Sequence, residues 1–485
     1  MEKDVKGFCE FEKDNDMFSR KYLGIPYWQY IRFAVCEGIF SPSIENKETI
    51  QKSKSKIKAV KDVIAEIKQA RVSTKKLKTV GIREFICFKT TKGHDRFYDY
   101  WKMPEEIDYL NIRCNNDPTC ISRNEINILE PYLKANISFL TKKKLHIIKR
   151  DAKEYEFLQS TVEKLTDKYG KCPTADYLEG LILRYSEYKK FYTPFWEKLF
   201  DSLQCKAFMV VWYYQVPMMI AYQIAKQRGI QIIELQHGVI NNHEEYWFED
   251  QRGVNNFTPD YFLAFGKQHI EWTKMLPSTL CLSVGYPFQD YMKSNLENIV
   301  TDERTIIIYP ETNKDFETLI DNFVNLIVEK NYRILMKLHP LQTDHYEVYY
   351  PILAKNRNIQ VITDQSKGIY YWLKLGKHHI MANTTVGHEA LVFPHTNICI
   401  ATNVNHEQMQ PLLDWGFARG FNNVDELLHL IDDPLSSKST MDRSNLWEDS
   451  GKKNIELFLS TMKHLKWPGV ENREKIISAM NKIEE

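Results

Sequence analysis

Short, fully apolar runs alternate with helical stretches along most of this 485-residue chain, and few folds accommodate that pattern. Apolar runs joined by helices are typical of parallel strands whose sheet is covered on both faces. In the first half of the chain we predict strands at residues 80–88, 207–212 and 230–235, and helices at 178–203 and 216–228. This alternation predicts a Rossmann-like α/β sheet.

A second series of the same kind follows Gly285-Tyr286-Pro287. We predict its strands at 305–309, 333–338, 360–363, 379–382 and 397–401, and its helices at 316–330, 369–375 and 386–392. The chain is too long for one hydrophobic core, so the two series predict two domains.

The expected fold class is therefore α/β, with two Rossmann-like domains facing a central cleft and an additional N-terminal helical segment. The predicted parts are a helical segment at 1–78, an acceptor domain at 79–295, a donor domain at 296–450, and C-terminal helices at 451–485 that pack across the domains.

Composition narrows the class of protein. Hydrophobic residues make up 43% and charged residues 27%, as in globular proteins, and a formal net charge of +1 provides no global field for nucleic acid. The nine cysteines form no CxxC motif, so we expect reduced thiols. The first residues contain no apolar signal region, and no run of about 18 apolar residues follows. We therefore expect a cytoplasmic protein.

Residues 45–78 form a locally basic segment. Eleven Lys and Arg lie between Lys47 and Lys78 against three acidic residues, and apolar residues from Ile57 to Ile67 recur at helical spacing. This pattern predicts that the segment forms an amphipathic helix with a lysine-rich face. That face is either solvated or in contact with an anionic membrane surface, which would make the protein peripheral on the inner face of the cytoplasmic membrane.

Polar residues that directly follow predicted strands are the first candidates for a site, because ligands of open α/β sheets bind beyond the carboxyl ends of the strands. Gln236 and His237 follow the strand at 230–235, where an imidazole can act as a general base. Lys337 and His339 lie two residues apart and share one face of an extended chain, so their donors suit a pyrophosphate. A purely structural histidine and unrelated strand-end side chains are the alternatives.

The stretch at 383–391 follows another strand and opens a predicted helix. Asn383, Thr384 and Thr385 would gather hydroxyls and free N–H groups at the helix start, which suits a phosphate. Glu389 lies one turn further and could accept hydrogen bonds from ribose hydroxyls. Helix capping alone would also explain these residues.

Two loops complete the set of candidates. Glu311 belongs to the polar stretch 309–314 after the first strand of the second series, and it is a candidate catalytic group unless this loop is merely solvated. His94 and Arg96 lie in the polar loop after the first strand of the first series, and with Gln236 they are candidates for the acceptor side.

We predict no metal site. A metal-bound diphosphate needs paired carboxylates after a strand, and the D-x-D sequence of this chain, Asp14-Asn15-Asp16, lies far from the strand series. Cationic side chains and a helix dipole would instead neutralise a departing phosphate. No cofactor is expected, because the nucleotide-activated donor is a substrate.

Five short motifs in a fixed order resemble one family. They are QHG at 236–238, PDYFLAFG at 259–266, VGYP at 284–287, KLHP at 337–340 and NTTVGHEAL at 383–391. Together they resemble the bacterial capsule-polysaccharide glycosyltransferases of the GT-B type, which are related to polysialyl- and Kdo-transferases and to teichoic-acid polyol-phosphate transferases. The resemblance spans about residues 205–402, and it implies essential roles for His237 and His339 and a donor-binding role for Thr384, Thr385 and Glu389.

The resemblance implies a metal-independent glycosyltransferase that builds a bacterial capsule or lipopolysaccharide from a nucleotide sugar. Its partners would be a CMP- or UDP-linked sugar and a glycan or glycolipid acceptor. A polyol- or sugar-phosphate transferase on the same scaffold is the first alternative. A nucleotide-sugar epimerase and a non-catalytic binding subunit are the others.

Overall fold

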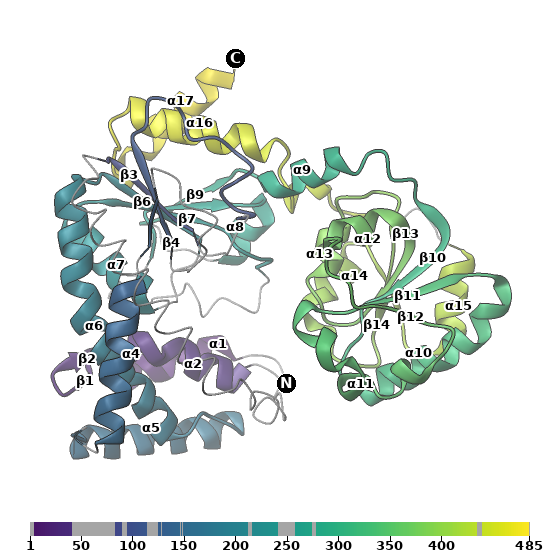
Figure 1. Ribbon diagram of the computed structural model, residues 1–485, viewed down its shortest axis with the longest axis horizontal. Coiled ribbons are helices and arrows are strands. Elements are labelled where there is room, and N and C mark those ends of the chain that lie inside the picture. Colours follow the sequence, from purple (N-terminus) through teal and green to yellow (C-terminus); the bar gives the residue numbers. More distant parts are fainter. Residues whose placement is uncertain are drawn as a thin grey trace. The chain divides into compact units, whose positions relative to one another are not determined.

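The computed structural model describes residues 4–40, 83–89, 95–113, 125–127, 129–145, 147, 149–211, 216–240, 258–273, 278–433 and 439–484. The chain divides into two compact units (Figure 1). Unit 1 comprises Met1–Ala264, His269–Val284 and Lys452–Glu485, and unit 2 comprises Phe265–Gln268 and Gly285–Gly451. The basic segment 45–78, with its predicted amphipathic helix, lies outside the described residues.

Unit 2 is built on a six-stranded parallel sheet in the order β12-β11-β10-β13-β14-β15. The strands are β10 (Asp302–Ile308), β11 (Arg333–Lys337), β12 (Gln360–Ile362), β13 (Gly376–Met381), β14 (Asn397–Ala401) and β15 (Arg419–Phe421). Numbered within the unit, this order is 3-2-1-4-5-6, that of dinucleotide-binding Rossmann sheets. Strand order therefore reverses between β10 and β13, and such a switch point is where open α/β sheets bind ligands.

Helices cover both faces of the unit 2 sheet (Figure 1). They are α9 (Pro287–Asn295), α10 (Lys314–Ile327), α11 (Tyr346–Tyr349), α12 (Ile369–Leu375), α13 (Val386–Ala390), α14 (Gln410–Asp414) and α15 (Val424–Asp432). In α10 the buried Phe316, Ile320 and Phe323 recur every three to four residues and pack against Ile306 and Ile308 of β10. Strands apolar on both faces are therefore covered as the sequence predicts.

Unit 1 contains a seven-stranded parallel sheet in the order β5-β4-β3-β6-β7-β8-β9. The strands are β3 (Phe85–Lys89), β4 (Tyr109–Arg113), β5 (Glu125–Asn127), β6 (Ala207–Val210), β7 (Gln231–Leu235), β8 (Tyr261–Ala264) and β9 (Leu280–Ser283). The same reversal of order occurs, here between β3 and β6. The fold class of two Rossmann-like parallel sheets is thereby confirmed.

Some helices of unit 1 cover its sheet, and others lie in a group apart from it (Figure 1). The helices of unit 1 are α1 (Val5–Asp14), α2 (Trp28–Phe40), α4 (Leu129–Lys144), α5 (Ala152–Tyr169), α6 (Ala175–Leu203), α7 (Val216–Gln227), α8 (Lys267–Thr273), α16 (Gly451–His464) and α17 (Arg473–Glu484), and a short hairpin joins β1 (Lys21–Tyr22) to β2 (Ile25–Pro26). Phe8 and Trp28 of the first two helices share a core with Leu158 and Leu178 of α5 and α6. The helical N-terminal residues 4–40 thus belong to unit 1.

The contacts within the structure place the boundaries between the two units at other residues than the sequence pattern predicted. The chain leaves unit 1 after Val284, not after residue 295, because α9 packs within unit 2, where Phe288 meets Tyr370 with ring centroids 5.5 Å apart. The C-terminal helices, expected to pack across the domains, belong to unit 1. There the ring of Trp467 stacks on Phe85 at 5.3 Å.

Two glycines lie where the chain enters and leaves unit 2. Gly285 has a φ of +87°, and a Cβ there would lie 2.3 Å from the carbonyl oxygen of Glu448. A Cβ on Gly451 would lie 2.7 Å from the backbone nitrogen of Tyr286. Both positions therefore require glycine, which explains the glycine of the VGYP sequence.

Candidate functional site

The carboxyl edge of the unit 2 sheet brings together the sequence stretches that follow β10, β11 and β13. These strands are parallel neighbours, so residues after Ile308, Lys337 and Met381 leave the sheet at the same edge. The stretches after β10 and β13 lie on either side of the switch point. Three of the four predicted site segments therefore belong to one edge of one sheet.

Lys337 ends β11 and is 6% exposed. Its Nζ donates to the carbonyl oxygen of Leu338 at 3.1 Å and to Oε1 of Gln365 at 2.5 Å. Burial lowers the pKa of this ammonium, and the carboxylate of Asp364 opposes the shift. An ammonium has three N–H donors, so one N–H besides those that reach Leu338 and Gln365 can contact a bound phosphate.

His339 lies two residues further and is exposed. Partial burial of the imidazole lowers its pKa, and the charge of Lys337 lowers it further. The two side chains are thus close enough to interact, as their shared strand face predicts. His339 is mostly neutral near pH 7, so it offers a hydrogen-bond donor and an acceptor but not a second full positive charge.

The segment after β13 differs from the expected anion site at a helix start. Helix α13 has only five residues, and Thr385 caps it without a side-chain hydrogen bond. The N–H groups of Gly387 and His388 already donate to carbonyl oxygens of Thr384 and Thr385, at 3.3 and 3.1 Å. Few helix N–H groups remain for a phosphate. Asn383 is also engaged, because its Oδ1 accepts from the backbone N–H of Gln408 at 2.9 Å.

Glu389 connects the segments after β13 and β10. It is half-buried on α13, and its carboxylate lies near Tyr309, whose pKa is raised well above its usual value by burial and then by this charge. The hydroxyl of Tyr309 is hydrogen-bonded to Nδ1 of His379 at 3.2 Å. Tyr309 was not assigned a role from the sequence, although it begins the polar stretch at 309–314.

Glu311 follows Tyr309 on the same side of the switch point. It is half-buried, and burial raises the pKa of its carboxyl group. Its Oε1 accepts from the N–H of Thr312 at 3.2 Å, and its charge helps to raise the pKa of Tyr350. A carboxyl group with a raised pKa suits proton transfer better than an ordinary one.

Unit 1 holds the remaining candidates at the end of β7. Gln236 is 1% exposed, and its Nε2 donates to the carbonyl oxygen of Gly238 at 2.7 Å, which closes the turn. Burial, and then the charge of Arg96, lowers the pKa of His237 to about 4. Arg96 and His237 are therefore close in space. His94 lies outside the described residues.

Glu234 is a buried group that sequence reasoning missed. It lies two residues before Gln236 in β7, is 2% exposed, and accepts from the hydroxyl of Tyr222 at 2.8 Å. Burial raises its pKa to about 8. The sequence feature that could have identified Glu234 is that it is a single acidic residue in the otherwise uncharged strand QIIEL.

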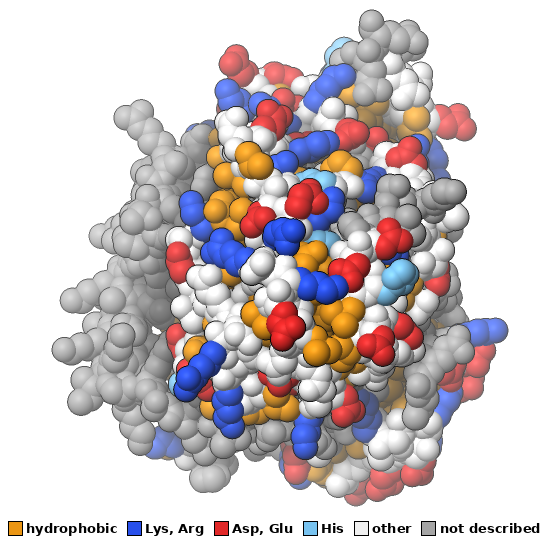
Figure 2. All heavy atoms as spheres, turned by 90° about the vertical axis from the view of Figure 1, so that its right-hand side faces the viewer, with side chains coloured by type: hydrophobic (Ala, Val, Ile, Leu, Met, Phe, Trp, Pro, Cys, Tyr) orange, Lys and Arg blue, Asp and Glu red, His pale blue; other side chains and the backbone are white. Residues whose placement is uncertain are grey.

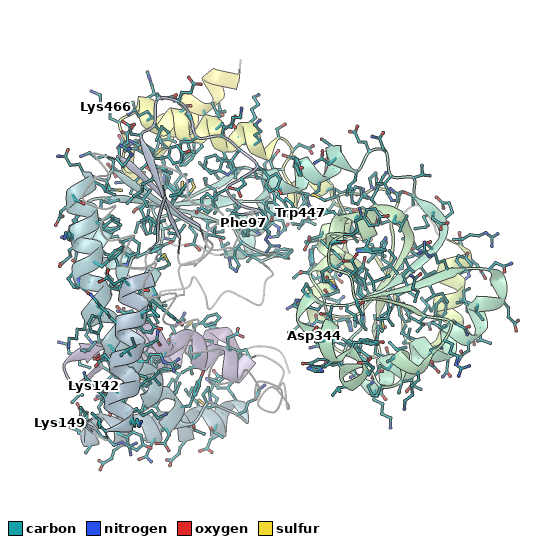
Figure 3. The ribbon with its side chains drawn as sticks, viewed as in Figure 1. Phe97, Lys142, Lys149, Asp344, Trp447 and Lys466 are labelled. Atoms are coloured by element: carbon teal, nitrogen blue, oxygen red, sulfur yellow. The ribbon has the colours of Figure 1, made fainter. Side chains whose placement is uncertain are left out.

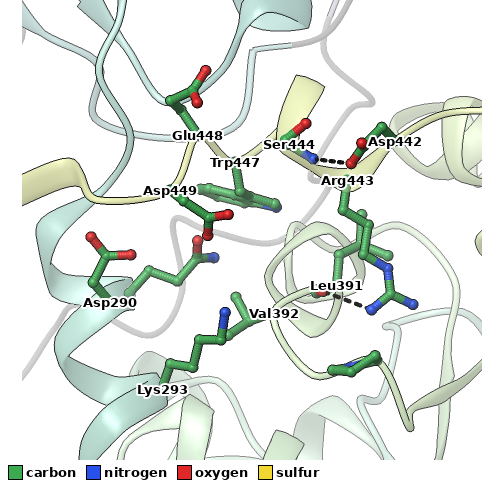
Figure 4. Close-up of a pocket in the computed structure, with 12 residues that line it drawn as sticks. Asp290, Lys293, Leu391, Val392, Asp442, Arg443, Ser444, Trp447, Glu448 and Asp449 are labelled. Carbon is green, nitrogen blue, oxygen red and sulfur yellow. Dashed lines mark hydrogen bonds between the residues drawn. The ribbon is translucent and has the colours of Figure 1, made fainter. Parts of the chain in front are cut away.

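A pocket of about 260 Å³ lies in unit 2 beside the residues that follow α13 (Figure 4). Leu391 and Val392 supply apolar surface, and Lys293 and Arg443 supply cations. Nε2 of Gln289, also in the lining, is buried without a hydrogen-bond partner in the described part of the chain. The acidic lining residues are Asp290, Asp442, Glu448 and Asp449. This mixture of donors, acceptors and apolar surface can hold a ligand rich in hydroxyl groups.

Among the described residues, no group of three or more His, Cys, Asp or Glu side chains is arranged to hold a metal ion. In the same part of the chain, no helix is both long and apolar enough to cross a bilayer.

No protein-family model matches the sequence, and no curated protein matches it. Similar solved structures include the UDP-GlcNAc 2-epimerase from Methanocaldococcus jannaschii, with 11% identity over 78% of this chain and 99% of that chain and a TM-score of 0.47. The UDP-GlcNAc 2-epimerase from Neisseria meningitidis bound to UDP-GlcNAc has 12% identity over 78% and 99%, with a TM-score of 0.44. A kitacinnamycin glycosyltransferase has 11% identity over 61% and 82%, with a TM-score of 0.36.

These similarities concern the fold alone. Two Rossmann-like sheets in one chain constitute a GT-B-like fold. The strand orders of the two sheets support this fold directly.

Proposed function

We propose that this protein transfers a sugar from a nucleotide-activated donor to a glycan or glycolipid acceptor and thereby builds a bacterial surface polysaccharide. The observation that carries the proposal is the carboxyl edge of the unit 2 sheet, where Lys337 ends β11, His339 follows it, and Glu389 follows β13 on the other side of β10. A buried ammonium, a neutral imidazole and a carboxylate are the groups that a diphosphate and a ribose need.

In the proposed reaction the bond between the sugar and the donor phosphate breaks, and its electron pair stays on the phosphate oxygen. The third N–H of Lys337 and the imidazole of His339 stabilise that developing negative charge. The acceptor hydroxyl forms the new glycosidic bond and loses its proton to a base. The candidate bases are Glu311 on the same edge of the unit 2 sheet and, from the sequence, His237.

Product analysis tests the proposed function. The purified full chain would be incubated with UDP- and CMP-linked sugars and capsule-type oligosaccharide acceptors, and products would be followed by mass spectrometry and phosphorus NMR. Extension of the acceptor by one sugar with release of the nucleotide is expected. A phosphodiester in the product would identify a phosphate transferase instead, and an altered sugar without any acceptor would identify an epimerase. Donor binding without turnover would leave only a binding protein.

The donor site makes a separate prediction. Lys337→Met removes a charge-assisted hydrogen bond, so we expect the affinity for a nucleoside diphosphate to fall roughly 10- to 100-fold in calorimetric titration. His339→Ala should also weaken binding, and the double variant should lose less than the sum of the two because the side chains interact.

The matched control is Lys355→Met, which removes an exposed lysine elsewhere in unit 2. Circular dichroism checks that each variant is folded. Wild-type affinity in both Lys337→Met and His339→Ala would mean that the donor binds elsewhere.

A further inference from the structure

Helix α4 of unit 1 has apolar residues on two faces. Leu133 and Phe139 are buried at 7% and 6% exposure on the side that packs on α6. Ile137 and Leu140 are 48% and 59% exposed. Residues three apart are neighbours on a helix surface, so Ile137 and Leu140 form one outward apolar stripe.

The stripe continues past the end of the helix. Leu145 and Ile147 are 61% and 60% exposed. Single exposed apolar residues are common on soluble proteins, but four within 11 consecutive positions, 137–147, need a partner to cover them.

The same segment is rich in cations. Lys142 pairs with Glu187, and Arg150 pairs with Glu179 at 2.6 Å. Lys143, Lys144 and Lys149 are exposed, and no described acidic side chain forms an ion pair with them. Figure 3 labels Lys142 and Lys149 at the lower left of the view, on the side of the molecule where α4 lies.

The combination of exposed apolar and cationic side chains indicates what kind of partner binds this surface. Exposed Leu and Ile side chains enter the boundary between headgroups and acyl chains, while lysine stems lie along it and bring their ammonium groups to lipid phosphates. A second copy of the chain fits poorly, because a twofold contact would place these lysines against one another. The view of unit 2 in Figure 2 is different, since Lys, Arg, Asp and Glu side chains intermingle there.

We propose that this surface docks on an anionic lipid bilayer. We call it the α4 face, and it consists of Ile137, Leu140, Lys143, Lys144, Leu145, Ile147 and Lys149. The proposal adds a partner to the protein and does not depend on glycosyl transfer. It also differs from membrane contact through the basic segment 45–78, because it uses other residues.

Vesicle sedimentation of the full chain tests the α4 face. Wild type should bind vesicles of phosphatidylglycerol and phosphatidylcholine and should not bind phosphatidylcholine alone. Lys143→Gln, Lys144→Gln and Lys149→Gln together should weaken binding on the order of 100-fold, since each cation contributes roughly fivefold. Leu140→Ser with Leu145→Ser should weaken it roughly tenfold.

Matched controls separate this surface from others. Val300→Ser with Val348→Ser changes residues of unit 2 that are 83% and 69% exposed, and it should leave vesicle binding unchanged.

Wild-type binding in both α4-face variants would overturn the proposal. Binding lost only when Lys54, Lys58, Lys61 and Lys68 are changed to Gln would also overturn it. A change of oligomeric state with intact vesicle binding would overturn it as well, in favour of a second copy. Vesicle binding needs no turnover, so the failure of the proposed function would not affect this result.

Discussion

Burial changes the protonation state of Glu234, the one carboxyl group in β7. The side chain is 2% exposed, and its hydrogen-bond partner is the hydroxyl of Tyr222. With a pKa of about 8, it keeps its proton at pH 7 in the folded protein. In the unfolded chain a glutamate ionises above about pH 4.3. The folded state therefore binds one more proton than the unfolded state between these two values.

This difference predicts how stability depends on pH. As the pH rises from about 4.5 to 8, the unfolded state loses the proton and the folded state keeps it, so the contribution of Glu234 to stability decreases. Glu234→Gln has nearly the same shape and no titration. It should be more stable than wild type at pH 8, with a difference that shrinks toward pH 5. Urea unfolding at pH 5, 6.5 and 8 measures this, with the exposed Glu156→Gln as control. A difference that is the same at every pH would contradict the assignment.

At the scale of elements, helix starts differ in what they can bind. In α10, Oδ1 of Asn313 accepts from the N–H groups of Asp315 and Phe316 at 2.8 and 3.2 Å. Asn313 is one of the polar residues at 309–314, and the sequence did not decide whether these residues contact a ligand or are merely solvated. In the structure its side chain caps the N-terminus of α10. In the short α13, by contrast, the capping residue Thr385 makes no such bond.

The α10 cap makes a prediction about stability. Asn313→Ala leaves two N–H groups of the helix start without their acceptor, so unfolding should become easier by about 1 kcal/mol. Asn313→Asp should retain most of the stability, because a carboxylate accepts the same bonds and favours the positive end of the helix dipole. Chemical denaturation measures both variants. Wild-type stability in Asn313→Ala together with lost donor binding would assign the residue to the ligand instead.

At the scale of the whole molecule, the chain enters unit 2 at Gly285 and leaves it at Gly451. Gly285 combines a positive φ with a close approach to the backbone of Glu448. A side chain at this position strains the backbone and also forces two chain segments apart. The entry and exit segments of unit 2 therefore depend on glycine for their packing.

Gly285→Ala should accordingly destabilise the protein by about 2 kcal/mol or more. Gly368→Ala is the matched control within unit 2, because no atom lies within 4 Å of its added Cβ and its φ of −66° suits any residue. Because Gly368 is the N-cap of α12, where glycine is preferred over alanine, that variant should lose only about 0.5 to 1 kcal/mol. Thermal unfolding compares the two. Equal melting temperatures would show that the segments near Glu448 separate without cost.

The helices, the strands and the class of fold can largely be predicted from the sequence. Helix α12 and strand β14 have the predicted bounds, and most other predicted strands of unit 2 differ from the observed ones by one to three residues at an end. Apolar periodicity is a local property, so it can be read without knowing the neighbours. Strands with weaker or shorter patterns, such as β4, β5 and β15, were not predicted.

Which side chains lie close together depends instead on how distant parts of the chain pack. Strand order places β13 beside β10, so Glu389 lies near Tyr309 although 80 positions separate them in the chain. The raised pKa of Glu234 arises from burial, and the α4 face is exposed because the opposite face of α4 packs on α6. Whether the 383–389 segment and Asn313 can contact a ligand likewise depends on which N–H groups already have acceptors within the protein. Burial, pairing and hydrogen-bond satisfaction depend on distant residues, and a local pattern carries no information about them.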